Sequence, residues 1–325
     1  MEIPDFPLST GDRVRGVVFG HAVGDAMGLG TEFLSKKEVQ ACYPGGLHFL
    51  DQIRRDSHRS RWKSGSWTDD TDQMLCILDS LLERGCVDIT DIAARIHGWA
   101  LSGGMGIGRT VAEVIYSPGF LRNPWAAAER AWIASGRRAA ANGGVMRTSI
   151  LGAWRWGHPE EIRKNAGDVC RITHWDPRCV ASCVVVCLAV SALLGGSDDR
   201  SSMAESLAAE AGGYDPEVRE AMERAYGGNI GDLDLGDPTS IGYTLKALSA
   251  GIWALLHPLD FREGILAVIH EGGDADSNAA VAGAVLGARF GFSGIPKEWS
   301  EGLLRGGELH SRVDRLLLLL QEQPR

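Results

Sequence analysis

Residues 279–287 read Ala-Ala-Val-Ala-Gly-Ala-Val-Leu-Gly, a stretch composed almost wholly of alanine, glycine and valine. Side chains this small allow a helix backbone to approach its neighbours closely. A helix that is apolar on every side is normally buried on every side. We therefore expect this stretch to be a central helix around which the rest of the chain packs.

Apolar residues recur at helical spacing elsewhere in the chain. One stripe follows Asp72 and consists of Met74, Ile77, Leu78 and Leu81. A second stripe, which ends at His257-Pro258, consists of Leu245, Leu248, Ile252, Leu255 and Leu256. Residues 265–269 fit a strand or a helix, but no series of β-branched runs with hairpin turns accompanies them. The last 20 residues are typical of a terminal helix. These patterns predict an all-α fold.

One domain over residues 1–325 is the expected organisation. A chain of 325 residues, of which 44% are hydrophobic, can bury a large core, and its length alone allows one domain or two. Residues 195–238 could be a surface excursion, although Leu207, Val218 and Met222 offer apolar anchors. We interpret the glycine-rich segments as loops that could form the rim of a site: residues 24–30, 103–108, 143–144 and 272–273.

The charge balance excludes generic attraction to nucleic acid or to an anionic membrane, because the formal net charge is −9. Residues 179–197 carry no charged side chain and approach the length of a membrane span. A helix buried on all sides explains this run better, since it stands alone in the chain. We expect neither nucleic acid nor a membrane as a partner, and we expect a monomer.

The seven cysteines include no CxxC pair, and the N-terminus resembles no secretory signal. Cys179, Cys183 and Cys187 would share one helical face, which could suggest a thiolate metal site. Thiolate sites normally include more closely spaced pairs, so buried small apolar side chains are the better interpretation. These features predict a reducing, cytoplasmic location.

Residues 67–72, Trp-Thr-Asp-Asp-Thr-Asp, place three carboxylates and two hydroxyls directly before an amphipathic helix. Helix capping by Thr71 or Asp72 would explain one or two of the acids. It does not explain all three, because crowded carboxylates repel one another unless cations or hydrogen bonds compensate them. Metal binding is the alternative interpretation.

Residues 273–278, Gly-Asp-Ala-Asp-Ser-Asn, form a second acidic cluster ahead of the central helix. A calcium loop is ruled out, because Ala279 stands at the turn glycine and Val285 at the bidentate glutamate. A phosphatase nucleophile would require a preceding strand, which is not evident. The five carboxylates of the two clusters exceed what one ion needs, and oxygen ligands favour Mg²⁺, so we expect a two-ion centre that uses most of these five: Asp69, Asp70, Asp72, Asp274 and Asp276.

These segments resemble the ADP-ribosylglycohydrolase family along nearly the whole chain and in the family's order. Residues 20–28 look like its G-x-x-x-G-D-A-x-G segment, which Glu32 follows. Residues 67–71 are similar to its T-D-D-T motif, and residues 142–147 to its N-G-x-x-M-R loop. Thr173-His174 matches a T-H motif, and residues 273–278 match D-x-D-S/T-N. Five motifs in register make chance resemblance implausible.

The resemblance implies a compact orthogonal helical domain with a binuclear metal site in a central cleft. It implies two Mg²⁺ ions, for which Mn²⁺ can substitute, held by Thr68, Asp69, Asp70, Asp274, Asp276 and Ser277. Ser277 stands where many members have threonine, and it keeps the hydroxyl. Asp69 and Asp276 would bridge the ions, and Glu32 or Asp70 would orient water or the leaving group. The implied catalytic residues are Glu32, Asp70 and Asp276.

The resemblance also implies ligand contacts away from the metals. Asn142, Gly143 and Gly144 would face the diphosphate and distal ribose through backbone N–H groups, and His174 and Tyr243 would meet the other end of the ligand. Purely structural interpretations compete with some of these roles. His174 could be a satisfied core histidine, and Tyr243 a core residue. Arg147 could pair with an acid, and Asp25 could cap or bridge helices.

The implied activity is Mg²⁺-dependent hydrolysis of the glycosidic bond between ADP-ribose and a modified protein or small molecule. Arginine is the favoured linkage, and ADP-ribosyl-serine and O-acetyl-ADP-ribose are the alternatives. A non-catalytic, crystallin-like or ADP-ribose-binding protein is a further alternative. The crowded carboxylates argue against it, because a site that no longer catalyses a reaction need not keep them. A Mg²⁺ phosphohydrolase would instead release phosphate or AMP.

Overall fold

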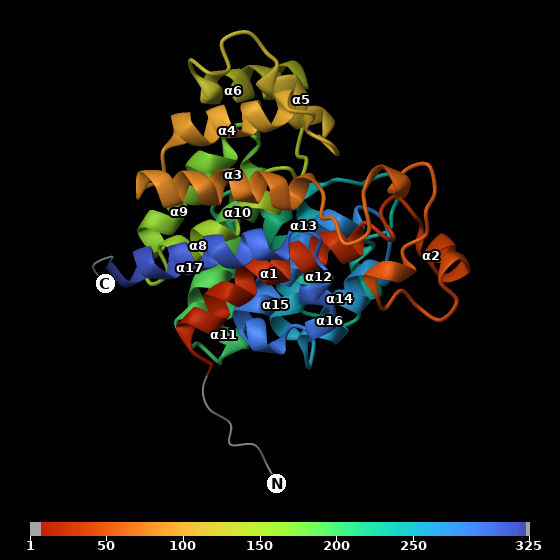
Figure 1. The fold of residues 1–325 in the computed structure, drawn as a ribbon. Helices are drawn as coiled ribbons and strands as arrows, with labels where there is room; N and C mark the ends of the chain where they lie inside the picture. Colours follow the sequence, from red (N-terminus) through yellow and green to blue (C-terminus); the bar gives the residue numbers. More distant parts are fainter. Residues whose placement is uncertain (1–7, 323–325) are drawn as a thin grey trace.

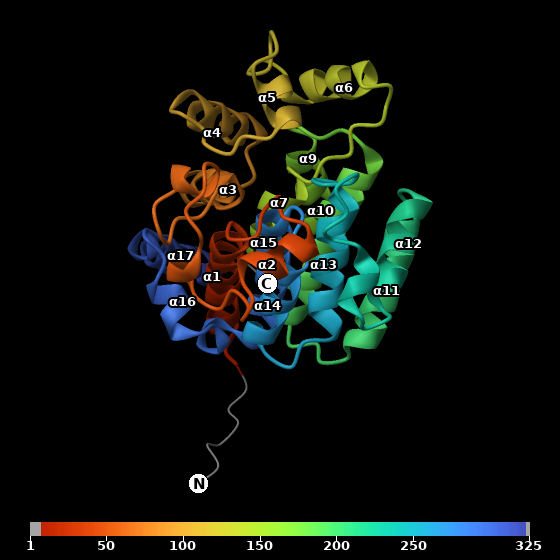
Figure 2. The ribbon, with the colours of Figure 1, turned by 90° about the vertical axis from the view of Figure 1, so that its right-hand side faces the viewer.

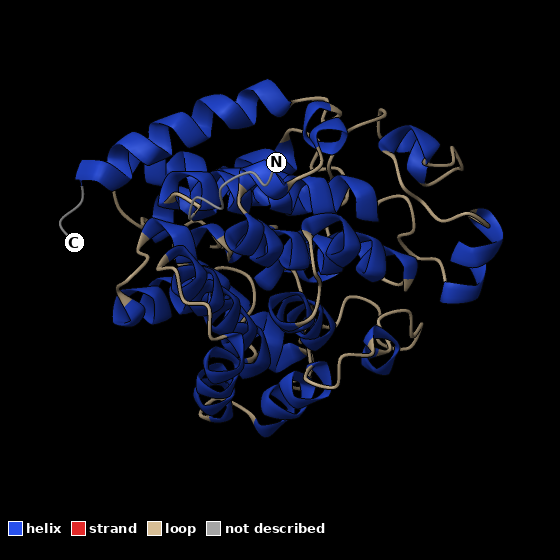
Figure 3. Cartoon of the chain, turned by 90° about the horizontal axis from the view of Figure 1, so that it is seen from below, coloured by secondary structure: helices blue, strands red, loops and turns tan. Residues whose placement is uncertain are grey.

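The computed structural model describes residues 8–322, which fold into α-helices and short 3-10 helices without a β-strand (Figure 1). The all-α prediction is therefore confirmed; the view from below shows helices joined by loops (Figure 3). A single isolated bridge among the described residues pairs Ala141 with Tyr243. The elements are α1 (Thr10–Gly28), α2 (Lys36–Cys42), η1 (Leu50–Gln52), η2 (Arg59–Arg61), α3 (Asp69–Arg84), α4 (Ile89–Leu101), α5 (Arg109–Ile115), α6 (Pro124–Ala134), α7 (Val145–Thr148), α8 (Ile150–Trp154), α9 (Pro159–Cys170), α10 (Pro177–Leu194), α11 (Arg200–Gly212), α12 (Pro216–Ala225), η3 (Ile230–Leu233), α13 (Thr244–Leu256), α14 (Phe261–His270), α15 (Ala275–Phe290), η4 (Phe292–Gly294), α16 (Lys297–Glu301) and α17 (Gly306–Glu322).

The centre of the fold is an antiparallel pair of helices, α1 and α15 (Figures 1 and 2). Every fourth residue of α1 facing α15 is a glycine, and the residues opposite are alanine or glycine. A Cβ added to Gly24 would lie 1.9 Å from the carbonyl oxygen of Ala279, and one added to Gly16 would lie 2.2 Å from that of Gly287. The two backbones are thus in direct contact, and the prediction of a central helix over residues 279–287 is confirmed.

The contact between α1 and α15 explains why the expected glycine-rich loop over residues 24–30 is mostly helix. Residues 24–28 were expected to belong to a glycine-rich loop, but they form the last turns of α1. Their glycines serve close helix packing, because any side chain there would meet the backbone of α15. The pairing also brings the C-terminal end of α1, at Gly28, next to the beginning of α15, at Ala275.

Helices α3, α10, α13, α14 and α17 pack against this pair, and α4, α5 and α6 lie farther out, beyond α3 (Figures 1 and 2). The apolar stripes of α3 and α13 are buried as predicted, apart from the half-buried Leu256 at the end of α13, and residues 265–269 belong to α14. Residues 195–238 contain α11 and α12, whose Leu207, Val218 and Met222 are buried, so this segment packs on the body of the protein. The predicted terminal helix is α17.

Helix α10 contains the uncharged run. Among the described residues it alone is long and apolar enough to cross a membrane by composition, with a mean hydropathy of 2.1, and 78% of this stretch is buried inside the protein. Its burial agrees with the prediction of a core helix. Cys179, Cys183 and Cys187 are buried free thiols on this helix, also as predicted.

Candidate functional site

The two acidic segments meet in space. Residues 68–70 stand at the beginning of α3 and residues 274–277 at the beginning of α15, and the hydroxyl of Thr68 lies 3.4 Å from Oδ2 of Asp276. Carboxylate oxygens of Asp25, Asp70 and Asp276 lie within 4.8 Å of one another. A second group, equally compact, joins Asp276 to Glu32 and Asp274. Two oxygen-lined groups sharing one carboxylate form the acidic cluster of this site.

Asp25, on α1, organises the cluster. Its Oδ1 accepts hydrogen bonds from the backbone N–H and the hydroxyl of Thr68, both at 2.8 Å. Its Oδ2 accepts from the backbone N–H of Thr71 at 2.9 Å and from the Thr71 hydroxyl at 2.6 Å. Asp25 therefore caps α3 from a neighbouring helix, which is the bridging role expected for it. The expected capping by Thr71 or Asp72 is wrong, because neither side chain caps α3.

Burial disfavours the ionised form of the carboxyl groups in the cluster. It raises the pKa of Asp25 and of Asp274 to about 6. Burial, followed by the charges of neighbouring carboxylates, raises the pKa values of Asp69, Asp70 and Asp276 well above the usual range. Oδ1 of Asp70 is buried, and no hydrogen bond within residues 8–322 reaches it. A buried acceptor without a donor, surrounded by mutually repelling carboxylates, fits a hard cation.

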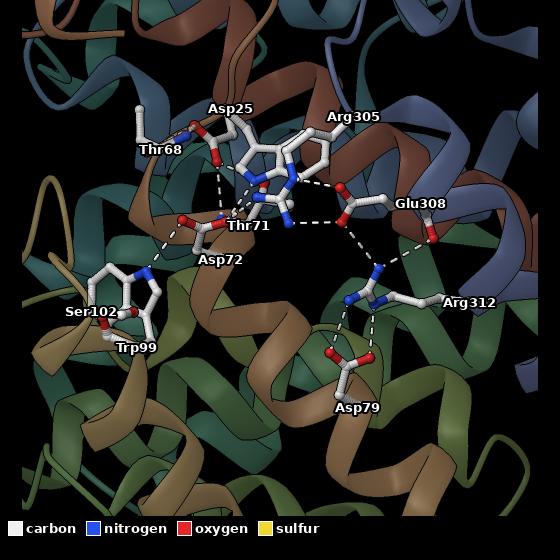
Figure 4. Close-up of polar contacts among 11 residues, drawn as sticks. Asp25, Thr68, Thr71, Asp72, Asp79, Trp99, Ser102, Arg305, Glu308 and Arg312 are labelled. Atoms are coloured by element: carbon white, nitrogen blue, oxygen red, sulfur yellow. Dashed lines mark hydrogen bonds and ion pairs between the residues drawn. The ribbon is translucent and has the colours of Figure 1, made fainter.

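Asp72, one of the five crowded carboxylates of the sequence, lies outside the cluster, and the ligand set that the resemblance implies omits it as well. Figure 4 shows it on the outer face of α3, where it accepts hydrogen bonds from Trp67 Nε1 (2.8 Å) and Trp99 Nε1 (3.2 Å). Arg305 of the loop before α17 lies 3.2 Å from the same carboxylate and 4.9 Å over the Trp67 ring. Asp72 thus fastens α3 to α4 and to that loop, because its side chain leaves the helix on the side away from Asp70.

A cleft of about 380 Å³ opens beside the acidic cluster. Most of the predicted site residues line it: Glu32, Asp69, Asp70, Asn142, Gly143, His174, Asp274, Asp276 and Ser277. Nδ2 of Asn142 donates to Oδ2 of Asp274 at 2.6 Å, which ties the loop over residues 142–144 to the cluster. We name this space the first cleft.

Three residues that were predicted to contact the ligand are not positioned to do so as expected. The backbone N–H of Asn142 donates to the carbonyl of Gly242 at 2.8 Å, so it is not available to a ligand. Gly144 does not line the first cleft and packs against the thiols of α9 and α10. Tyr243 is also outside the lining, with its hydroxyl 2.7 Å from Glu217 and 3.2 Å from Arg178. The first cleft therefore uses fewer residues of these loops than the sequence suggested.

A second cleft of about 360 Å³ reaches the same carboxylates from another direction. It shares Glu32, Asp69 and Asp276 with the first cleft, and its own wall includes His58, Trp62 and Thr68. Sequence reasoning missed His58, whose Nε2 lies 2.7 Å from Oε2 of Glu32, because it belongs to no recognisable motif. The acidic cluster thus stands where two clefts meet.

The glycine-rich segment over residues 103–108 lines both clefts, as its composition suggested. Gly106 has a φ of 95°, in the left-handed region that favours glycine. A Cβ added there would lie 2.4 Å from Oδ1 of Asp69. Backbone of this loop therefore rests directly on one predicted metal ligand.

The profile of the ADP-ribosylglycohydrolase family matches residues 7–325. The chain is 26% identical to the ADP-ribosylarginine hydrolase Tri1 of Serratia proteamaculans, over 96% of this chain and 81% of that protein. It is 28% identical to the ADP-ribosyl-dinitrogen reductase glycohydrolase of Rhodospirillum rubrum, over 96% and 97% of the two chains. A solved structure described as an ADP-ribosylglycohydrolase-related protein complex superposes with a TM-score of 0.73 at 28% identity, covering 96% of this chain and 99% of that one.

Proposed function

The chain belongs to the ADP-ribosylglycohydrolase family, and from this premise we propose that it is a Mg²⁺-dependent hydrolase that releases ADP-ribose from modified arginine side chains of proteins. Hydrolysis of a glycosidic bond of ADP-ribose is the activity that family membership supports. Arginine is supported by the name of a relative that covers most of this chain. Glu32, which lines the second cleft and is not among the predicted metal ligands, would also suit a guanidinium group.

The residues present fit a pair of Mg²⁺ ions. The predicted ligands supply only oxygen atoms, which Mg²⁺ prefers, and all lie at the acidic cluster: Thr68, Asp69, Asp70, Asp274, Asp276 and Ser277. Thr68 has one hydroxyl proton, and donating it to Asp25 leaves its lone pairs for a cation. When bound, the ions would supply positive charge that holds the ribose hydroxyls and offsets the carboxylate repulsion.

Different side chains of this protein can take different roles in breaking the glycosidic bond. Breaking a bond at the anomeric carbon develops positive charge on the sugar ring, which nearby carboxylates stabilise. Glu32 lies where the two clefts meet, so it can orient water or accept or donate a proton at the leaving group. His58 holds one oxygen of that carboxylate. The first cleft would bind ADP-ribose and the second the molecule that departs.

The observation that carries this proposal is the meeting of two acidic segments, about two hundred residues apart, within 4.8 Å at a cleft. The test offers arginine-linked and serine-linked ADP-ribosyl peptides, and O-acetyl-ADP-ribose, with Mg²⁺ and with a chelator. We expect intact ADP-ribose from the arginine-linked peptide, and only with the metal. Release of AMP or phosphate would indicate a phosphohydrolase, and metal-independent ADP-ribose binding without turnover would indicate a binding protein.

Some expectations remain predictions. They are the roles of the individual site residues, the single domain over residues 1–325, the monomeric state, the cytoplasmic location, and Mn²⁺ as a substitute for Mg²⁺. The two metals can be compared in the same peptide assay. Gel filtration with light scattering would measure the mass of the protein in solution.

A further inference from the structure

A buried chain of hydrogen bonds connects the acidic cluster to His174. Gln73 Nε2 donates to Asp69 Oδ2 at 3.2 Å, and Arg147 Nη1 donates to Gln73 Oε1 at 2.6 Å. Arg147 Nη2 donates to the Thr173 hydroxyl at 2.5 Å, and that oxygen lies 2.8 Å from His174 Nδ1. All five side chains are buried, with Gln73 and Arg147 fully inaccessible. We name this chain the Arg147 relay.

Arg147 does not pair directly with an acid, contrary to one of the interpretations considered from the sequence. Its two bonded nitrogens contact an amide and a hydroxyl, and its Nε has no partner among the described residues. Its hydrogen-bonded connection to Asp69 runs through Gln73. A fully buried cation in this arrangement serves to fix the direction of hydrogen bonds.

The direction follows from which groups can accept. A guanidinium donates only, so Gln73 must present its oxygen to Arg147 and its nitrogen to Asp69. The Thr173 oxygen likewise accepts from Arg147. Among the hydrogen bonds of residues 8–322, the one acceptor near the Thr173 proton is His174 Nδ1. If His174 carried its proton on Nδ1 instead, the buried Thr173 hydroxyl would have no acceptor for its own proton, which costs free energy.

His174 is therefore protonated at Nε2. Burial, and then the charge of Arg147, lower the pKa of His174 to about 3, so the ring is neutral at neutral pH. Its Nε2 is buried and has no hydrogen-bond partner in the described part of the chain, and the ring lines the first cleft beside Gly143. A Cβ added to Gly143 would lie 3.1 Å from Nε2, so only glycine leaves this nitrogen uncovered by a side chain.

We propose that Gln73, Arg147 and Thr173 are positioning residues that hold His174 as a neutral Nε2–H donor, and that its partner is an acceptor oxygen of a ligand hydroxyl or phosphate. An unpaired buried donor gains most from an acceptor that enters with the ligand. The same relay fixes Asp69, whose Oδ2 is held by Gln73 while Oδ1 faces Gly106. The inference rests on the proposed function only in taking ADP-ribose as the ligand.

The tautomer can be measured in the ligand-free protein. In a sample labelled with ¹⁵N-histidine, the His174 signals, assigned by their loss in His174→Gln, should show the Nε2–H tautomer. Thr173→Val keeps the side-chain shape and removes the hydroxyl, and it should produce a mixture of tautomers or the Nδ1–H form. Thr173→Ser should restore the native pattern. A native Nδ1–H tautomer, or unchanged signals in Thr173→Val, would overturn the proposal.

Binding of ADP-ribose in the presence of Mg²⁺ tests the donor role. Loss of one oriented hydrogen bond should raise the Kd of Thr173→Val about three- to tenfold, with Thr173→Ser within twofold of the native protein. Thr244→Val is the matched control, because the Thr244 hydroxyl is buried and lies outside the relay. An unchanged Kd in Thr173→Val, with the tautomer altered, would contradict the donor role. A native protein that binds no ADP-ribose would instead refute the proposed function, and the NMR result would still decide the relay.

Discussion

Asp25 Oδ1 accepts two hydrogen bonds from Thr68, one from the backbone N–H and one from the hydroxyl, both at 2.8 Å. Asp25 belongs to the central helix α1, and Thr68 begins the acidic segment of α3. The contact therefore sets the position of the acidic segment relative to the core. It also orients the Thr68 hydroxyl, so that the core packing of α1 and α15 and the geometry of the site depend on each other.

Replacement of Asp276 by alanine tests the site with little risk to the fold. Asp276 belongs to both oxygen-lined groups, so its loss should reduce ADP-ribose release at least a hundredfold. Removing one of several repelling carboxylates should leave the melting temperature of the metal-free protein unchanged or higher. Peptide hydrolysis and thermal unfolding measure the two effects. Near-native turnover would refute the assignment of Asp276.

The stabilisation given by Mg²⁺ should increase with pH. Burial raises the pKa of Asp25 and Asp274 from 3.8 to about 6, so the folded, metal-free protein binds more protons than the unfolded chain between these values. The contribution of these two carboxyl groups to the free energy of unfolding of the metal-free protein therefore falls as the pH rises through that range. Mg²⁺ requires the deprotonated ligands and offsets this loss. We expect the difference in melting temperature between Mg²⁺ and chelator to grow from pH 5 to pH 8, and a constant difference would contradict this.

The packing of α1 on α15 predicts a strong effect of Gly24→Ala. The new Cβ would lie 1.9 Å from the Ala279 carbonyl oxygen, so the helices must separate, at a cost of about 3 kcal/mol or more in the free energy of unfolding. Gly98→Ala is the control, because nothing lies within 4 Å of that Cβ on α4. It should stabilise the protein by about 0.5–1 kcal/mol. Urea unfolding of both variants would reveal the contrast, and similar effects would contradict the packing.

The loop over residues 103–108 provides a matched pair of substitutions. Gly103 and Gly106 both have positive φ, so alanine strains the backbone at either position. Only at Gly106 does the Cβ meet Asp69, since nothing lies within 4 Å of a Cβ at Gly103. Gly106→Ala should therefore lower kcat at least tenfold more than Gly103→Ala. Equal kcat values would show that contact with Asp69 is unimportant.

The sequence predicted the helical class and the central helix, because short local patterns of apolar and small residues carry both. It also predicted that the two acidic segments meet, because each segment is a short local run of carboxylates and hydroxyls that suits the same metal site. The local pattern alone does not separate Asp72 from Asp69 and Asp70, although the ligand set that the resemblance implies omits Asp72. What removes it from the site is its contact with Trp99 and Arg305, which are distant in the sequence.

Other features depend on tertiary partners in the same way. The glycines of residues 24–28 suggested a loop, since their partners on α15 appear only in the folded chain. His58 was missed because a histidine outside any motif carries no signal until Glu32 is placed beside it. The Arg147 relay joins residues from three separate segments, and only coordinates can give its direction.

The central claim, that the acidic segments of α3 and α15 together hold two divalent cations, is tested most directly by anomalous diffraction from crystals soaked in Mn²⁺. We predict two anomalous peaks per chain at the acidic cluster, ~3.5 to 4 Å apart, between the carboxylates of Asp69 and Asp70 and those of Asp274 and Asp276. Absence of both peaks, or manganese bound only at sites away from these four residues, would contradict the account.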